Sequence, residues 1–214
     1  MTEQNLRQDI IDACLLMNAN GLNQGTSGNI SVRLGDKMLI TPTSVPYDRT
    51  TPEMIAAMDL SGEMTGSWEG EAPPSSEWRF HWKILKQRPE FNAIVHAHPP
   101  YCTTLAILRK PIPACHYMVA AFGGADVRCA GYSSYGTEQL AVMALNALKD
   151  RSACLLANHG MIVAGADLEK AMWRAVELET LARQYWQALQ VGEPVILGNR
   201  EIEETLARFE GYGI

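Results

Sequence analysis

The chain has 214 residues, of which 47% are hydrophobic and 20% charged, a composition typical of a globular protein and not of a disordered one. Its 18 Lys and Arg against 24 Asp and Glu give a net charge of -6, which argues against nucleic acid or a membrane surface as a partner bound by non-specific attraction. No stretch reaches the roughly 18 apolar residues of a membrane helix, and the N-terminus lacks the pattern of a signal peptide. We therefore expect a cytoplasmic protein whose scattered cysteines are free thiols.

The first half of the chain is predicted to form a helix followed by a hairpin. Apolar residues at three- and four-residue steps predict a helix over 5–18, which Gly21 would end. Alternating apolar residues predict a half-buried strand at 29–34, paired across a short turn with a second strand at 38–41. The segment 62–74 is rich in Gly, Glu and Pro and is expected to form a loop or a hairpin tip.

The rest of the chain is predicted to alternate between helices and strands. One helix should start at Ser75–Glu77, where serine hydroxyls can cap free N–H groups and the carboxylate suits the positive end of the helix. Asp167 and Asn199 can cap two later helices. The expected helices lie at 77–87, 101–109, 137–149 and 168–190, with a last one from the cap Asn199 to about Phe209, and the expected strands at 92–98, 153–158 and 161–164. Because no linker separates these segments, we expect one α/β domain over 1–214.

Three of the histidines suggest a metal site. His96 and His98 lie two residues apart in an expected strand, so their side chains would face the same way, about 6.5–7 Å apart. His159 lies in a turn with Gly160 between two apolar strands, and it would complete the three protein ligands that a catalytic zinc usually takes. By spacing alone, two histidines at a strand edge and one capped histidine in a turn fit equally well.

Glu77 is the candidate for proton transfer. It lies on the expected first turn of a helix and close in sequence to the histidine strand. The alternative is a surface glutamate that complements the helix dipole. His81 follows Glu77 by one helical turn, and we interpret it as packing or as support for the site rather than as a metal ligand.

Three short segments offer hydroxyls and backbone N–H groups without positive side chains: 25–29, 41–44 and 75–76. Such loops, and a helix N-terminus, bind phosphate without a lysine. Each segment alone also fits an ordinary turn or cap. None ends in the GK[ST] of a phosphate-binding P-loop, which disfavours a nucleotide-binding fold. Tyr117 could donate a phenolic proton, although a tyrosine beside an apolar segment belongs more often to the core.

Together these segments resemble the class II aldolase/adducin family over nearly the whole chain. The ordered matches are GLNQGTSGNISVR (21–33), MLITPTSVPY (38–47), PPSSEWRFH (73–81), IVHAHPPYC (94–102), IPACHYMVAAFGG (112–124), YGTEQL (135–140), LLANHGMI (155–162) and LEKAMWRAVELE (168–179). The resemblance implies a three-layer α/β/α fold around a mainly antiparallel sheet. It also implies a C4 homotetramer whose active sites lie at subunit interfaces.

The resemblance further implies retro-aldol cleavage of a ketose 1-phosphate to dihydroxyacetone phosphate and an aldehyde, through an enediolate that a divalent metal stabilises. The implied metal is Zn²⁺, one per subunit, with Mn²⁺ or Co²⁺ as alternatives. The implied ligands are His96, His98 and His159. Glu77 would be the catalytic acid/base, and Tyr117 of a neighbouring subunit would handle the proton of the C4 oxygen. The implied phosphate pocket consists of Gly28, Asn29, Thr43, Ser44, Ser75 and Ser76.

Three features depart from the pattern of the family's sugar-phosphate aldolases. Ser44 stands where glycine is usual, and Tyr135 replaces a phenylalanine that borders the aldehyde side. The chain ends soon after Tyr212, another residue expected on that side. These departures affect the aldehyde and not the bond that is cleaved. We expect a substrate like L-fuculose 1-phosphate, with 5-deoxyribulose 1-phosphate and 5-methylthioribulose 1-phosphate as alternatives.

Other activities known in the family fit less well. Pentulose-phosphate 4-epimerases carry aspartate after the paired serines, where this chain has Glu77. A methylthioribulose 1-phosphate dehydratase keeps a glutamate but would release no dihydroxyacetone phosphate. Non-catalytic modules like the adducin head lack the histidines, all three of which are present here.

Overall fold

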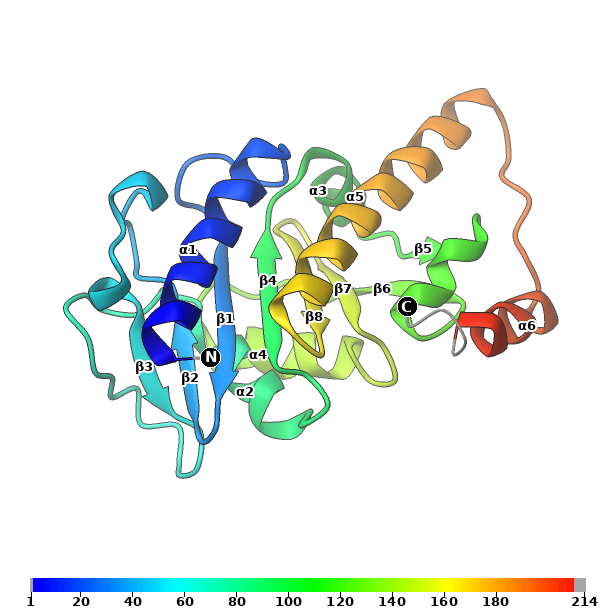
Figure 1. The fold of residues 1–214 in the computed structure, drawn as a ribbon. Helices are drawn as coiled ribbons and strands as arrows, with labels where there is room; N and C mark the ends of the chain where they lie inside the picture. The colour runs from blue at the N-terminus through cyan, green and yellow to red at the C-terminus, as the bar shows by residue number, and fades with distance from the viewer. Residues whose placement is uncertain (1, 210–214) are drawn as a thin grey trace.

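A computed structural model describes residues 2–209, in which one sheet of eight strands lies between two layers of helices (Figure 1). The helices are α1 (Glu3–Ala19), α2 (Trp78–Gln87), α3 (Pro100–Ile107), α4 (Glu138–Ala147), α5 (Leu168–Val191) and α6 (Asn199–Phe209). The strands are β1 (Asn29–Leu34), β2 (Lys37–Ile40), β3 (Ala56–Asp59), β4 (Ala93–Ala97), β5 (Ile112–Pro113), β6 (Asp126–Ala130), β7 (Ala153–Leu156) and β8 (Gly160–Gly165).

The sheet has the strand order β3-β2-β1-β4-β8-β7-β6-β5. Within residues 2–209, the neighbouring strands β6 and β7 run parallel and the other neighbours run antiparallel. β4 and β8 pair at the centre, with Ala97 opposite Met161 and Ala93 opposite Gly165. The last residues of β4 therefore lie beside the first residues of β8. The expectation of a mainly antiparallel sheet is confirmed.

The two faces of the sheet carry separate apolar cores. One core joins the sheet to α1, α3 and α5, and the other joins it to α2 and α4. Figure 1 shows α1 and α5 crossing the front of the sheet. Alternation along β4 assigns Val95 to the first core and Ile94 to the second. His96 shares the face of Ile94, as the period of two predicts, and its ring meets Phe80 of α2 edge to face. The three-layer α/β/α architecture is confirmed.

Several helix ends follow the expected capping chemistry. The Asp167 carboxylate accepts a hydrogen bond of 2.7 Å from the backbone N–H of Lys170 and so caps α5, as predicted. α1 begins earlier than expected because the Thr2 hydroxyl accepts a hydrogen bond from the N–H of Asn5. Asn199 was expected to precede its helix but is the first residue of α6. Among residues 2–209, even the 24-residue α5 is not apolar enough to cross a bilayer, nor is any other helix.

The sequence did not predict three strands and three short helices. The strands are β3, β5 and β6, and the short helices of the 3₁₀ type are Tyr47–Arg49, Pro52–Met54 and Tyr117–Phe122. β3 is missed because its first three residues are all buried apolar groups, so no alternation marks it. β5 has two residues and becomes a strand only by pairing with β6. Such short elements depend on partners distant in sequence, which local patterns do not reveal.

Candidate active site

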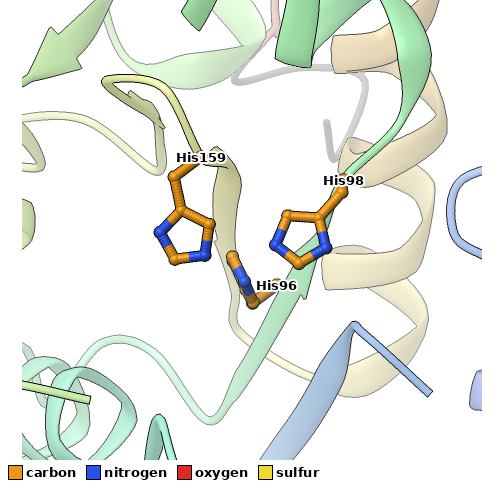
Figure 2. Close-up of side chains that lie close together, drawn as sticks. All are labelled: His96, His98 and His159. Atoms are coloured by element: carbon orange, nitrogen blue, oxygen red, sulfur yellow. The ribbon is translucent and has the colours of Figure 1, made fainter. Parts of the chain in front are cut away.

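Three imidazoles meet at the edge where β4 ends and β8 begins (Figure 2). His96 lies in β4, His98 directly follows that strand, and His159 directly precedes β8. The ring centroids of His96 lie 4.7 Å from those of His98 and 4.8 Å from those of His159. The nitrogens that could bind a metal all lie within 4.8 Å of one another. The structure thus favours the metal-site interpretation over three separate histidines.

The hydrogen bonds of His96 leave one nitrogen free for a ligand. Nδ1 lies 2.8 Å from the carbonyl oxygen of Met161, which can only accept a hydrogen bond, so Nδ1 carries the hydrogen. Nε2 is fully buried and has no hydrogen-bond partner. A carbonyl that fixes one imidazole nitrogen and leaves the other bare toward the site is the usual support of a metal-binding histidine.

Glu77 lies directly against this cluster. One carboxylate oxygen, Oε2, lies 3.0 Å from His96 Nε2, and the other, Oε1, lies 3.2 Å from His159 Nε2. The side chain is 5% exposed and makes no cap hydrogen bond with α2, although Glu77 occupies the cap position. The alternative of a surface glutamate that complements the helix dipole is therefore wrong.

The charges in the cluster depend on one another. Burial alone would raise the pKa of Glu77, but the imidazoles of His96 and His159 outweigh it and hold that pKa well below its usual range. Burial would lower the pKa of His96, and the carboxylate of Glu77 outweighs it and raises that pKa. Burial, together with the other two imidazoles, lowers the pKa of His98 to about 3. The carboxylate of Glu77 is thus held ionised against the imidazoles of His96 and His159, an arrangement that favours positive charge at this position.

The donor set fits a divalent metal ion. His96 Nε2 and Glu77 Oε1 are both buried polar atoms without a hydrogen-bond partner, and such atoms are rare in folded proteins because they are costly. Three imidazole nitrogens are a common set for catalytic zinc, with room for a further ligand. His96, His98 and His159 could therefore hold a metal ion.

Gly160 allows the turn and the strand to approach each other. A Cβ at Gly160 would lie 2.5 Å from the carbonyl oxygen of Ala97 and 2.6 Å from Cδ2 of His98. The preceding Asn158 adopts a left-handed conformation with φ of 55°, which closes the turn. Asn158 thus closes the turn that carries His159, and Gly160 leaves the space that the ring of His98 occupies.

A pocket of about 400 Å³ opens beside the cluster. It brings Glu77, His98 and His159 together with the whole predicted phosphate pocket, while His96 lies buried behind it. The lining consists of Thr26, Ser27, Gly28, Asn29, Pro42, Thr43, Ser44, Ser75, Ser76, Glu77, His98, Tyr132, Ser133, Tyr135, Asn158 and His159. Ser44 has a φ of 59°, a left-handed backbone conformation that glycine adopts more easily than serine. This agrees with the glycine expected at this position from the family resemblance.

Some residues of the pocket were not predicted, and some predicted residues lie elsewhere. Tyr132 and Ser133 line the pocket, and the signal for them was a hydroxyl-rich segment with glycines directly after β6. Tyr135 lines the pocket as predicted. Tyr117 does not line it; its side chain is 50% exposed and contacts the rings of His116 and Phe209, so it is not a core residue. Tyr212 lies outside the described residues.

Comparison with known proteins agrees with this architecture. The family model of the Class II Aldolase and Adducin N-terminal domain matches residues 8–186. The 5-methylthioribulose-1-phosphate/5-deoxyribulose-1-phosphate aldolase of Rhodospirillum rubrum is 50% identical over 208 residues, which cover 97% of this chain and 92% of that protein. The L-fuculose phosphate aldolase of Escherichia coli O6:H1 is 47% identical over 215 residues, which cover 100% of this chain and 98% of that protein. A solved structure of L-fuculose 1-phosphate aldolase superposes with a TM-score of 0.92 at 39% identity, covering 98% of each chain.

With the fold, the site and these similarities together, the chain belongs to the class II aldolase and adducin family. Within that family it is an aldolase, as are the relatives to which it is similar over almost its whole length.

Gly160→Ala should weaken metal binding, because the added methyl group would push His98 away from the other two imidazoles. We expect the affinity for Zn²⁺ to fall on the order of 10-fold or more, measured by competition with a chromogenic chelator. The control is Gly192→Ala, since a Cβ at Gly192 meets open space and its backbone is extended. An affinity equal to that of the control in a folded Gly160→Ala protein would contradict the assignment of His98.

Proposed function

We propose that this protein is a zinc-dependent aldolase that cleaves a ketose 1-phosphate to dihydroxyacetone phosphate and an aldehyde. The observation that carries the proposal is a single pocket that joins the histidine cluster, a buried carboxylate and a cradle of phosphate-binding groups. A substrate like L-fuculose 1-phosphate is proposed first, and 5-deoxyribulose 1-phosphate or 5-methylthioribulose 1-phosphate is the alternative. The names of the Escherichia coli and Rhodospirillum rubrum relatives support these two choices, respectively.

In the proposed site, His96, His98 and His159 hold the metal. Three neutral imidazoles suit Zn²⁺, and Mn²⁺ or Co²⁺ would accept the same ligands. When bound, the ion supplies Lewis-acid stabilisation of the negative charge that develops on the substrate oxygens. The remaining work falls to the side chains around it.

Glu77 is proposed to move the proton at C3. When the C3–C4 bond breaks, its electron pair stays on the C3 side, and C3 must then gain a proton to give dihydroxyacetone phosphate. The carboxylate lies against the imidazoles of His96 and His159 and lines the pocket, so it can meet a carbon held there. No lysine lines the described part of the pocket, so a Schiff base with the substrate is not part of the proposal.

The phosphate group is proposed to bind in the cradle of Gly28, Asn29, Thr43, Ser44, Ser75 and Ser76. These residues come from the start of β1 and the residue before it, from the segment after β2 and from the segment before α2, and all of them line the pocket. They offer hydroxyl, amide and backbone N–H donors, and the described lining contains neither Lys nor Arg. Binding the phosphate at one end of the pocket would fix the position of the reacting carbons at the other.

The proton on the C4 oxygen is assigned to Tyr117 of a neighbouring subunit in a C4 homotetramer. Within one protomer Tyr117 lies outside the pocket lining and half of its side chain is exposed, so it is free to enter the pocket of another copy. In the bond-forming direction the phenol of Tyr117 would donate its proton to the aldehyde oxygen, which becomes the C4 hydroxyl. In cleavage the phenolate would take that proton back as C3–C4 breaks and C4 becomes the aldehyde carbon. Tyr135 and Tyr212 are proposed to border the aldehyde half of the site.

The first test is a coupled assay for dihydroxyacetone phosphate with four substrates: L-fuculose 1-phosphate, L-rhamnulose 1-phosphate, 5-deoxyribulose 1-phosphate and 5-methylthioribulose 1-phosphate. We expect turnover of one of the proposed substrates, complete loss after EDTA treatment, recovery with Zn²⁺, and no inactivation by borohydride. Turnover of a substrate without dihydroxyacetone phosphate would indicate a dehydratase or an epimerase instead.

Glu77→Gln should keep the metal and lose most of the turnover, since the amide cannot carry the proton. The loss should be roughly 10²- to 10⁴-fold. A direct readout is the exchange of a hydrogen of dihydroxyacetone phosphate with D₂O, followed by proton NMR, because reversal of the last step requires the same group and no aldehyde. Glu71→Gln, at an exposed glutamate, is the matched control. Near-normal exchange by Glu77→Gln would remove Glu77 from this role.

The assignment of Tyr117 to a neighbouring subunit predicts complementation between two inactive variants. Glu77→Gln and Tyr117→Phe, each weakly active alone, should form hybrid rings when they are co-expressed. In an equal mixture about a quarter of the sites would combine Glu77 from one subunit with Tyr117 from the next. Hybrids should therefore recover about a quarter of the wild-type activity, and no recovery would contradict a shared site.

A further inference from the structure

Behind the pocket, a chain of buried polar side chains leads away from Glu77. The amide nitrogen of Asn29, Nδ2, donates a hydrogen bond of 3.0 Å to Glu77 Oε2. The amide oxygen of Asn29, Oδ1, lies 2.5 Å from Nε2 of His81. The other ring nitrogen of His81, Nδ1, lies 2.7 Å from the hydroxyl oxygen of Ser31. All four side chains are buried, and Ser31 and His81 are completely so.

The chemistry of these groups fixes the direction of the hydrogen bonds. An amide oxygen can only accept, so Nε2 of His81 must carry a hydrogen and donate it to Asn29. If the amide of Asn29 turned over, its oxygen would face a carboxylate oxygen, and its nitrogen would face a ring N–H. Both contacts would then be repulsive. With the hydrogen on Nε2, His81 and the carboxylate of Glu77 therefore favour the same amide orientation, the one that gives Glu77 a donor.

This series of hydrogen-bonded side chains can position Glu77 but cannot conduct a proton. An amide neither gains nor loses a proton at ordinary pH, so Asn29 cannot pass one between His81 and Glu77. The single amide of Asn29 contacts both Glu77 and His81, and Asn29 also lines the pocket. An unlocked amide would thus disturb the carboxylate and the phosphate cradle together.

We propose that His81 is a positioning residue that locks the amide of Asn29 and, through it, holds the Glu77 carboxylate in place for proton transfer. The proposal rests on the role of Glu77 in the proposed function. It assigns His81 no contact with substrate or metal, since both of its ring nitrogens are already engaged by Asn29 and Ser31.

Two isosteric amides provide the test. In His81→Gln the amide nitrogen lies as many bonds from Cα as Nε2 does, so it can still donate to Asn29. In His81→Asn the amide nitrogen corresponds to Nδ1 and can reach only the side of Ser31. We expect His81→Asn to lose roughly 10-fold or more of the kcat for exchange of dihydroxyacetone phosphate with D₂O. His81→Gln should keep most of it, and both variants should retain one metal ion per chain.

His81→Phe and Trp82→Phe complete the set. His81→Phe keeps the stacking on Phe80 and should lose as much exchange as His81→Asn. Trp82→Phe lies on the same helix and removes a hydrogen bond to the carbonyl of Asp59, away from the pocket, so it should retain wild-type exchange. In NMR spectra of protein with ¹⁵N-labelled histidine, the His81 resonances, identified by their absence in His81→Phe, should show the hydrogen on Nε2.

Equal activity of the Gln and Asn variants, or a hydrogen on Nδ1 alone, would overturn the proposal. Failure of the underlying function has a different signature, because Glu77→Gln would then keep its exchange activity. If Glu77→Gln loses exchange while His81→Asn and His81→Phe keep it, the proposed role of His81 is wrong and the proposed role of Glu77 is unaffected.

Discussion

The site depends on the burial of one carboxylate against two imidazoles. Glu77 reaches its position because β1, β4 and the start of α2 converge at one place, and the price of removing its charge from water is met by His96, His159 and Asn29. Two of these groups are held in turn, His96 by the carbonyl of Met161 and Asn29 by the ring of His81. The buried carboxylate and the two imidazoles therefore stabilise one another, and removing the carboxylate would leave both imidazoles without this partner. A cation among the imidazoles would complete the balance of charge.

Close backbone contact around this unit explains why small residues recur beside it. Gly160 lets the turn carrying His159 touch the end of β4, and Gly28 does the same on the other side, where a Cβ would lie 2.7 Å from the carbonyl oxygen of His96. The two glycines bring the strand ends near enough for the three imidazoles at the ends of β4 and β8 to meet. The pairing of β4 with β1 and β8 fixes which residues lie side by side, and the glycines allow the neighbouring backbones to approach closely.

The three histidines of the cluster were candidates from the sequence, and the pocket was predictable only in part. The period of two in β4 and the turn at Asn158-His159-Gly160 are local patterns, so they marked the three histidines as candidates, although spacing alone fitted separate histidines equally well. The phosphate cradle was indicated by composition, and it needed the family resemblance to become one site. Tyr132 and Ser133 follow β6, which pairs with the distant β7, so their hydroxyl-rich segment did not by itself place them at the pocket. The burial of Glu77 was equally hidden, because a glutamate at a helix start is ordinarily a surface residue.

The division between buried and exposed residues also separates chemistry from specificity. His96 is 0% exposed and Glu77 5%, whereas Tyr132 is 56% and Tyr135 71% exposed. A buried residue cannot change without disturbing its partners, so the groups proposed to break the bond are constrained by the whole core. Exposed tyrosines on a loop can change with little effect on stability. This accounts for a chain that is 50% and 47% identical to aldolases named for different sugars. Under the proposed function, such proteins would share the buried groups, while the exposed part of the pocket, which Tyr132 and Tyr135 line here, would meet the part of the sugar that differs.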